Sequence, residues 1–261
     1  MAETSSIFAP GVLEGRTALI TGGGTGLGKA AARELLACGA RVLICGRREE
    51  VLRAACAELG DGCEWVTGDV RSDSECARIV DEALERFGRL DTVVNNAGGQ
   101  YFVPAEAIAL KGWQAVTRLN VGGTLAMAVA AYERALRPAG SGMVINVTLS
   151  PHHGLPGMTH SSAARAAVEG LTRELAATWA ADGVAVCACA AGHFETEAIQ
   201  KYPDAVRAGA ARSVPLGRLG RPEEHAWLIA LLATPLGRRF SVSVVTLDGA
   251  RDNWYRPWPP G

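Results

Sequence analysis

The sequence has no apolar run that approaches the roughly 20 residues needed to cross a bilayer. It also has no N-terminal stretch that joins a cationic region to an apolar one, as a secretory signal would. Basic runs are absent, and the formal net charge of −1 gives no general attraction to nucleic acid or to an anionic membrane. These absences predict a cytosolic protein with neither a membrane nor a nucleic acid as a partner.

The cysteines lack the spacing of a metal or disulfide framework. Their count of seven is odd, and one residue separates the close pair Cys187 and Cys189. This spacing is neither a redox CxxC nor half of a zinc ribbon. We therefore expect no metal site and interpret the cysteines as small buried apolar residues.

What the sequence does contain is a regular alternation of short apolar runs with amphipathic stretches, which is typical of βαβ units around a parallel sheet. A length of 261 residues, 48% of them hydrophobic, suits a single α/β domain over residues 1–261. We expect its core over about residues 13–250 and a Pro- and Trp-rich tail at 251–261. The seven expected strands are residues 17–21, 41–45, 64–67, 91–95, 143–148, 184–190 and 242–248.

Helix signals lie between these strands. Ser72 to Glu75 forms a capping box that opens a helix, and Gly88 is expected to end it. Two long Ala-rich helices are expected at about 112–137 and 160–181, with faces suited to a sheet or to a neighbouring subunit.

A glycine-rich run, TGGGTGLG at Thr21 to Gly28, lies between the first strand and the first helix. Without Cβ atoms at Gly22, Gly26 and Gly28, the backbone can turn tightly and approach a pyrophosphate, whose charge faces the helix N-terminus. The run predicts a dinucleotide site.

Two arginines indicate which dinucleotide this is. Arg47 and Arg48 follow the second strand, where an NAD enzyme usually places an acid on the ribose hydroxyl. Guanidinium groups there favour a 2′-phosphate and hence NADP(H), although they could instead only cap a solvated helix start. Asp69 and Val70, after the third strand, are placed to hold the adenine edge. Residues 95–98 follow the fourth strand at the expected topological switch point.

Together these features resemble the short-chain dehydrogenase/reductase family: the TGxxxGxG turn, Asp69, the NNAG motif at Asn95 to Gly98 and an active-site Asn at Asn120. The resemblance implies one doubly wound Rossmann domain, with a seven-stranded parallel sheet, helices on both faces, and a homotetramer or homodimer formed through the two long helices. It also implies these cofactor contacts: Gly22, Thr25, Gly26, Leu27, Gly28, Arg47, Arg48, Asp69, Val70, Asn96, Ala97, Gly98, Arg165 and Thr196.

The sequence departs from the family at its catalytic positions. The family's Tyr, Lys and Ser fall on Ser161, Arg165 and a position near Thr148. Arg165 can donate to ribose hydroxyls but cannot relay a proton. Ser161 is a poor general acid at neutral pH. His193, in a segment that usually reads Pro-Gly, adds an imidazole beside the cofactor.

The sequence around these altered catalytic positions is similar to one branch of the family. Residues 96–100, 104–106, 111–113 and 160–166 resemble the peroxisomal trans-2-enoyl-CoA reductases and their bacterial relatives, and residues 21–29 resemble the 2,4-dienoyl-CoA reductases. Both groups use NADPH to reduce a double bond conjugated to a thioester. The implied substrate is a small acyl thioester or a conjugated carbonyl compound.

Charge in that reaction collects on the carbonyl oxygen, so hydrogen bonds to this oxygen are the main requirement. We expect them from Asn120, Thr148 and Ser161.

The proton that completes the reaction has several candidate donors. Tyr101 is the first choice for a displaced acid, and Ser150, His152 and His153 lie on the loop after the fifth strand. Water is a further source, and Tyr202 is expected to be a lid contact.

Three other functions stay open. The first is a carbonyl or alcohol oxidoreductase with a displaced proton donor. The second is an enzyme of the same fold that catalyses a non-redox cyclisation, isomerisation or dehydration in secondary metabolism. The third is a binding protein without activity.

Overall fold

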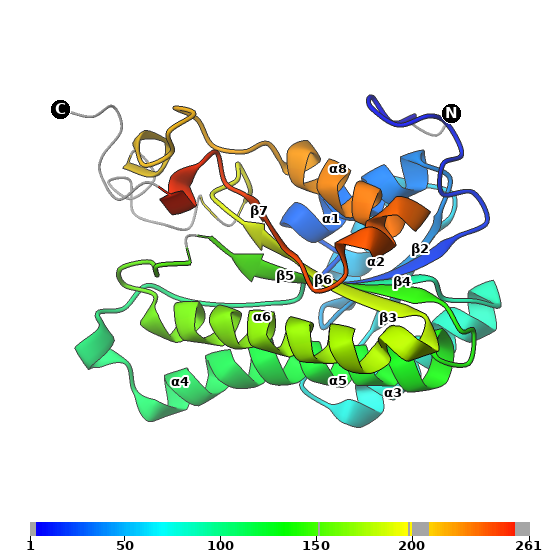
Figure 1. Cartoon of the computed structure of the whole chain (residues 1–261), viewed down its shortest axis with the longest axis horizontal. Helices are drawn as coiled ribbons and strands as arrows, with labels where there is room; N and C mark the ends of the chain where they lie inside the picture. The colour runs from blue at the N-terminus through cyan, green and yellow to red at the C-terminus, as the bar shows by residue number, and fades with distance from the viewer. Residues whose placement is uncertain (1–3, 151, 198, 200–208, 254–261) are drawn as a thin grey trace.

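Figure 1 shows, as a computed structural model, a parallel sheet between two layers of helices; the structure describes residues 4–150, 152–197, 199 and 209–253. The seven strands are β1 (Thr17–Thr21), β2 (Arg41–Gly46), β3 (Cys63–Thr67), β4 (Thr92–Asn95), β5 (Gly142–Leu149), β6 (Val184–Ala191) and β7 (Val244–Leu247). Their order is β3-β2-β1-β4-β5-β6-β7, and every neighbouring pair is parallel. The chain changes direction across the sheet between β1 and β4, so the predicted doubly wound Rossmann fold and its switch point are confirmed.

The strands follow from their sequences. Every residue of β1 and β6 is buried, because helices cover both faces of a parallel sheet. All seven strands were expected from the apolar runs, and their ends differ from the expected ones by no more than two residues.

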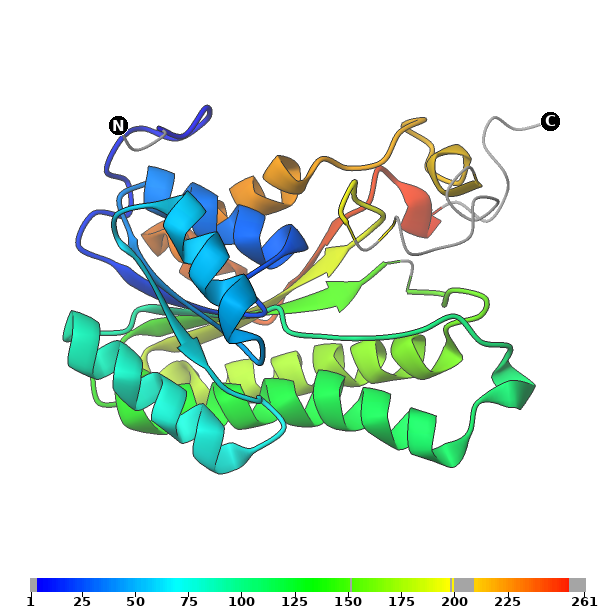
Figure 2. The same cartoon turned by 180° about the vertical axis from the view of Figure 1, so that it is seen from behind.

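The α-helices divide between the two faces of the sheet. They are α1 (Gly26–Ala37), α2 (Glu49–Leu59), α3 (Asp73–Phe87), α4 (Leu110–Thr117), α5 (Gly123–Ala131), α6 (Thr159–Trp179) and α8 (Pro222–Ala233). Figures 1 and 2 show α1, α2 and α8 on one face, with α3, α4, α5 and α6 on the other. One apolar cluster lies under each layer.

Shorter helical segments complete the chain. The 3-10 turns are η1 (Ala105–Ala107), η4 (Ala180–Asp182), η6 (Pro235–Phe240) and η7 (Arg251–Asn253), and the π-turns are η2 (Arg118–Gly122) and η3 (Tyr132–Leu136). The first expected long helix is therefore a helical run from α4 to η3 with two π-turns in it. Among the described residues, no helix has both the length and the apolar character to cross a membrane.

The predicted helix signals are also found. The Ser72 hydroxyl accepts from the Glu75 backbone N–H at 3.4 Å, and Gly88 ends α3 in the left-handed region with φ 76°. All seven cysteines are free thiols and six are buried. Burial raises the pKa of Cys45 to about 12, which fits the interpretation as small apolar residues.

Candidate active site

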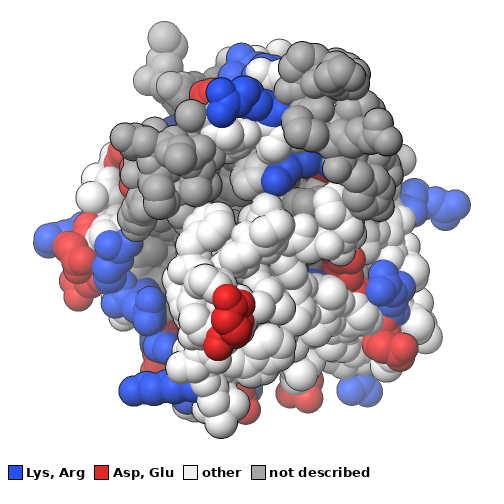
Figure 3. Space-filling view, turned by 90° about the vertical axis from the view of Figure 1, so that its left-hand side faces the viewer, with Lys and Arg blue, Asp and Glu red and all other residues white. Residues whose placement is uncertain are grey.

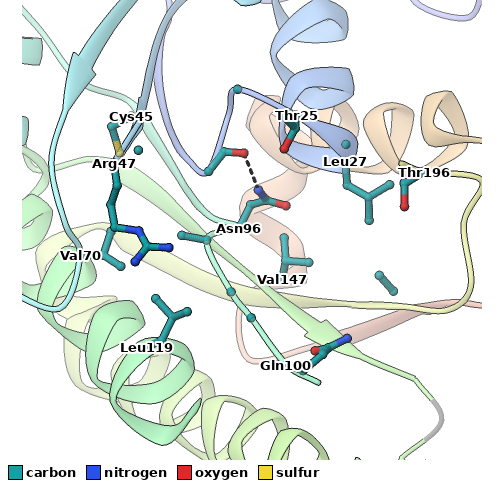
Figure 4. Close-up of a pocket in the computed structure, with 18 of the residues that line it drawn as sticks. Thr25, Leu27, Cys45, Arg47, Val70, Asn96, Gln100, Leu119, Val147 and Thr196 are labelled. Carbon is teal, nitrogen blue, oxygen red and sulfur yellow. Dashed lines mark hydrogen bonds between the residues drawn. The ribbon is translucent and has the colours of Figure 1, made fainter. Parts of the chain in front are cut away.

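A cavity of about 600 Å³ opens at the carboxyl ends of the strands. Figure 3 faces this end of the molecule: uncharged side chains make up most of the central area around an acidic one, and Lys and Arg side chains lie at the left and right margins and at the top. Thirteen of the fourteen predicted cofactor contacts line the cavity, all except Gly28: Gly22, Thr25, Gly26, Leu27, Arg47, Arg48, Asp69, Val70, Asn96, Ala97, Gly98, Arg165 and Thr196. Figure 4 shows several of these side chains around the opening.

The glycine-rich turn is built for close backbone contact. Gly22 and Gly26 have φ of 67° and 54°, a region that glycine adopts without strain. A Cβ on Gly28 would lie 2.4 Å from Asn96 Nδ2 and 2.5 Å from the Gly22 carbonyl oxygen. Gly28 thus lies behind the turn and lets α1 start directly at the cavity wall, as an anion-binding helix N-terminus requires.

Asn96 holds this turn in place from the neighbouring strand end. Its Nδ2 donates to the carbonyl oxygens of Thr21 at 2.9 Å and Gly22 at 3.3 Å, and the second of these bonds is drawn in Figure 4. The Thr21 hydroxyl accepts from the backbone N–H groups of Asn96 and Ala97 at 3.0 and 2.9 Å. The two predicted motifs therefore form one hydrogen-bonded unit across β1 and β4.

The end of β2 carries positive charge. Arg47 and Arg48 are exposed and line the cavity, and Figure 4 shows the Arg47 guanidinium turned toward it. Asp69 lies nearby. Hydrogen bonds from Arg71, together with the charges of Arg71 and Arg47, lower the pKa of Asp69 to about 2. The Asp69 carboxylate is thus already paired with Arg71. Among the described residues, neither Arg47 nor Arg48 forms an ion pair with a carboxylate.

Arg165 lies deeper in the cavity wall. Its Nη1 donates to the Val147 carbonyl oxygen at 2.7 Å, while its buried Nε has no partner. Burial lowers the pKa of Arg165 to about 10, so the group stays charged at neutral pH. A Cβ on Gly98 would come within 2.1 Å of Arg165 Nη2, which shows how closely the NNAG backbone passes over the guanidinium.

Asn120 does not line the cavity. It lies in the π-turn η2, where its Nδ2 donates to the carbonyl oxygens of Gly99 at 2.8 Å and Val116 at 2.9 Å. Its Oδ1 accepts from the Gly99 N–H at 3.2 Å. The amide therefore fixes the backbone after β4, and the predicted hydrogen bond from Asn120 to substrate has no free donor in this arrangement.

Thr148 does line the cavity, at the end of β5, and it begins a polar chain that leads to the surface. Its hydroxyl donates to Glu169 Oε1 at 3.0 Å. His152 Nε2 lies 2.9 Å from the same oxygen, and His152 Nδ1 lies 2.5 Å from Asp252 Oδ2. Burial alone would lower the pKa of His152, but Asp252 and Glu169 together raise it above the ordinary value.

Two further predicted catalytic residues lie outside the cavity. Ser161 is fully buried and donates to Gln100 Oε1 at 2.9 Å. The Tyr101 ring packs edge-on against His160 at 4.5 Å, and its hydroxyl lies where a Cβ on Gly112 would be. This geometry gives no support to Ser161 as a direct donor to substrate or to Tyr101 as the acid. Tyr202 lies outside the described residues.

A second, more apolar cavity of about 250 Å³ adjoins the first. Five residues line both cavities: Leu27, Gln100, Leu149, Gly192 and Thr196. Its remaining wall includes the apolar side chains of Phe102, Leu155, Met158, Phe194 and Ile199. The first cavity can thus hold a dinucleotide while an apolar substrate occupies the second.

His193 lines this second cavity and is hydrogen-bonded to Arg251. Burial, followed by the positive charge of Arg251, lowers the pKa of His193 to about 4. At neutral pH its Nε2 accepts from the guanidinium, so His193 is a neutral wall residue and its remaining Nδ1–H is too weak an acid to act as the proton donor.

The site contains residues that the sequence did not single out. Gln100 follows the NNAG motif and lies between the two cavities. Glu169 is four residues after Arg165 on α6, and that spacing on one helix face is a signal that could have found it. Asp252 comes from the far C-terminal end, and no local pattern points to it.

Comparison with known proteins places this site in a family. Residues 22–249 match the family model described as enoyl-(acyl carrier protein) reductase. A probable 2,4-dienoyl-CoA reductase of Bacillus subtilis is 36% identical over 257 residues, with 95% of this chain and 100% of the relative covered. The cis-4-hydroxycyclohexanecarboxylate dehydrogenase of Sinomonas cyclohexanicum is 36% identical, with 90% and 95% covered. The solved citronellol catabolism dehydrogenase AtuB of Pseudomonas aeruginosa has a TM-score of 0.85 and 34% identity, with 95% and 99% covered.

Proposed function

The chain belongs to the short-chain dehydrogenase/reductase family of oxidoreductases, and from this membership we propose that it is an NADPH-dependent reductase of a carbon–carbon double bond conjugated to a thioester or ketone carbonyl. The match to the family model and the dienoyl-CoA reductase of B. subtilis support the reaction type.

The larger cavity fits the cofactor. The turn at Gly22 and Gly26 suits a pyrophosphate at the start of α1, and Arg47 and Arg48 suit a 2′-phosphate. Arg165 lies where it can donate to the nicotinamide ribose. When bound, NADPH supplies a hydride to the electron-poor carbon of the substrate.

One observation carries the choice of substrate: in the described part of the chain, no tyrosine lines either cavity. A phenol is the group that ketone and alcohol chemistry in this family relies on. Reduction of a conjugated double bond instead places negative charge on the carbonyl oxygen, where preorganised donors contribute about 3 kcal/mol each. Gln100 lines both cavities and Thr148 lines the larger one, so both can face that oxygen.

The second cavity suits the acyl part of such a substrate. Phe102, Leu155 and Met158 would exclude water from the reacting carbons, which strengthens every hydrogen bond in the site. The neutral His193 adds no charge there.

A second candidate is an alcohol or ketone oxidoreductase. The hydroxycyclohexanecarboxylate dehydrogenase has the same 36% identity to this chain as the B. subtilis relative, over fewer residues, and its name describes oxidation of a ring hydroxyl. The same cavities can hold such a ring.

A substrate panel distinguishes these functions. Purified protein is incubated with NADPH and, in separate reactions, with enoyl and dienoyl thioesters, conjugated enones, saturated ketones and alcohols with NADP⁺, while nicotinamide absorbance is followed. We expect turnover of the conjugated compounds. Turnover of saturated ketones and alcohols alone would favour the second candidate, and no turnover despite NADPH binding would reject both.

The Gly28→Ala variant is the control for this assay. Its Cβ meets the Gly22 backbone and Asn96, so the turn must open and turnover with every substrate should fall.

A further inference from the structure

Four segments distant in sequence meet in one line of polar side chains behind the larger cavity. The line starts at Thr148 on β5, passes to Glu169 on α6 and then to His152 on the loop after β5. It ends at Asp252 in η7, which accepts from both the backbone N–H and the Nδ1 of His152 at 2.5 Å. The side chains become more exposed from Glu169, at 11%, to His152, at 33%, and the Asp252 side chain is 20% exposed.

Both ring nitrogens of His152 face carboxylate oxygens, so both must donate and the ring is held as an imidazolium. The groups that face the ring are Glu169 from α6, Asp252 from η7 and the neighbouring His153, whose Nδ1 lies 3.9 Å from Asp252. The two carboxylates beside the ring favour its charged form.

Glu169 lies where it can pass a proton between His152 and Thr148. A single oxygen, Oε1, touches both the Thr148 hydroxyl and His152 Nε2. A proton that leaves the imidazolium through this oxygen therefore needs only one carboxylate atom and one hydroxyl rotation to reach the cavity wall.

We propose that His152, Glu169 and Thr148 form a proton relay that delivers a proton from solvent to the reduced substrate, since no tyrosine among the described residues lines either cavity. This relay rests on the proposed reductase function. It assigns His152 and Glu169 as relay residues and Thr148 as the group that touches substrate.

The hydride that bound NADPH would supply forms one carbon–hydrogen bond, and the electron pair of the double bond moves to leave an enolate and NADP⁺. The imidazolium passes its Nε2 proton to Glu169 Oε1, and Glu169 passes a proton to the Thr148 oxygen as the Thr148 O–H bond breaks and its proton forms a bond to a carbon of the enolate. His152 is left neutral, and a hydronium ion from solvent restores the imidazolium. One solvent proton is consumed, and the protein ends unchanged.

Three variants test the relay against the substrate that the wild-type protein turns over best. His152→Gln and Glu169→Gln keep the shape of the side chains but cannot pass a proton, so kcat should fall about tenfold or more with KM little changed, since general acids contribute roughly 100-fold. Glu174→Gln, exposed on the same helix as Glu169, is the matched control and should keep kcat within about twofold. Equal activity of the first two variants and wild type would overturn the relay.

The Asp252→Asn variant tests whether His152 delivers a proton or only holds its loop in place. It keeps the chain of contacts but removes one of the two charges that hold the proton on His152. Because the protonated ring is the active form, kcat falls as pH rises through its pKa. The variant should move this limb of the kcat profile to lower pH and keep activity in acid. A uniform loss of kcat at every pH, with the limb unmoved, would contradict the proposal.

Histidine NMR titration of the protein without cofactor or substrate gives a readout independent of turnover. The His152 resonance should titrate above the ordinary histidine range in wild type and at lower pH in Glu169→Gln and Asp252→Asn. An ordinary or lowered His152 pKa would reject the relay even if the reductase function holds. If the wild-type protein reduces no conjugated substrate, the proposed function fails, and the relay fails with it.

Discussion

At the scale of single residues, Arg165 is expected to lower the folding stability of the protein and to strengthen its binding of the cofactor. Its guanidinium is buried, its Nε has no partner, and it makes no ion pair among the described residues. Taking such a charge out of water costs several kcal/mol, so the apo-protein carries a destabilising group that a cofactor ribose can satisfy.

Arg165→Met should therefore leave the unfolding free energy in urea unchanged or raise it by about 1 kcal/mol or more. The same change should weaken NADPH binding about tenfold or more, measured by fluorescence titration, because charged hydrogen bonds are lost. Arg173→Met, an exposed position on the same helix, should alter neither quantity. Lower stability together with an unchanged NADPH affinity would show that the charge is structural.

Arg47 carries the cofactor preference at the same scale. Replacing it by Asp places a carboxylate against a 2′-phosphate and offers an acceptor to a ribose hydroxyl. We expect the preference for NADPH over NADH in kcat/KM to fall about tenfold or more. Arg53→Asp, exposed on α2 and outside the cavity, is the matched control. An unchanged preference would refute the assignment of NADP(H).

At the scale of elements, α8 places a histidine where it cannot be charged. His225 is fully buried beside the Phe194 ring, and burial lowers its pKa to about 4. The unfolded chain binds a proton near pH 6.5, so stability is full above that pH and falls as the pH drops toward 4. The loss reaches about 3 kcal/mol.

Urea unfolding between pH 4.5 and 7 measures this effect. The His225→Leu variant should flatten the pH dependence relative to wild type while it keeps the volume of the side chain. A slope equal to that of wild type would mean that other groups dominate.

Elements were also the level at which the sequence was most informative. The apolar runs placed β1 and β5 because parallel strands buried on both faces must be continuously apolar. The glycines placed the turn at Gly26 because its positive φ favours glycine. The sequence did not reveal the π-turn at Asn120, since its hydrogen bonds to Gly99 and Val116 depend on a loop that no periodic pattern describes.

The directions of side chains in the site could not be predicted from the sequence either, because they depend on loops without a periodic pattern. Tyr101 was the first choice for the displaced acid, but its ring packs on His160 and it does not line the larger cavity. The contact between His152 and Asp252 joins residues 100 apart, and only the folded sheet brings them together. The residues that line the larger cavity could be predicted because they lie in local sequence motifs. The contacts that connect Thr148, Glu169, His152 and Asp252 could not, because they join residues far apart in the sequence.

At the scale of the whole molecule, the expected assembly through the long helices is a proposal that the surface supports. Leu125 on α5 is 39% exposed, and Leu110 and Trp113 on α4 are 71% and 37% exposed. We propose that two copies pack through this face to form a dimer or a tetramer.

Light scattering after size exclusion measures the mass. Leu125→Glu should lower it to that of a smaller species, because a buried carboxylate would lack a partner. Leu236→Glu, exposed on η6, should leave it unchanged. A wild-type mass equal to that of a monomer would contradict the proposed dimer or tetramer.

The contact between His152 and Asp252 also has a practical side. Because Asp252 belongs to η7, the chemistry of the cavity depends on a segment that lies 100 residues away in the sequence. A substitution that displaces η7 therefore alters the surroundings of the imidazole. Activity screens of variants in this segment thus need a pH profile as well as a rate.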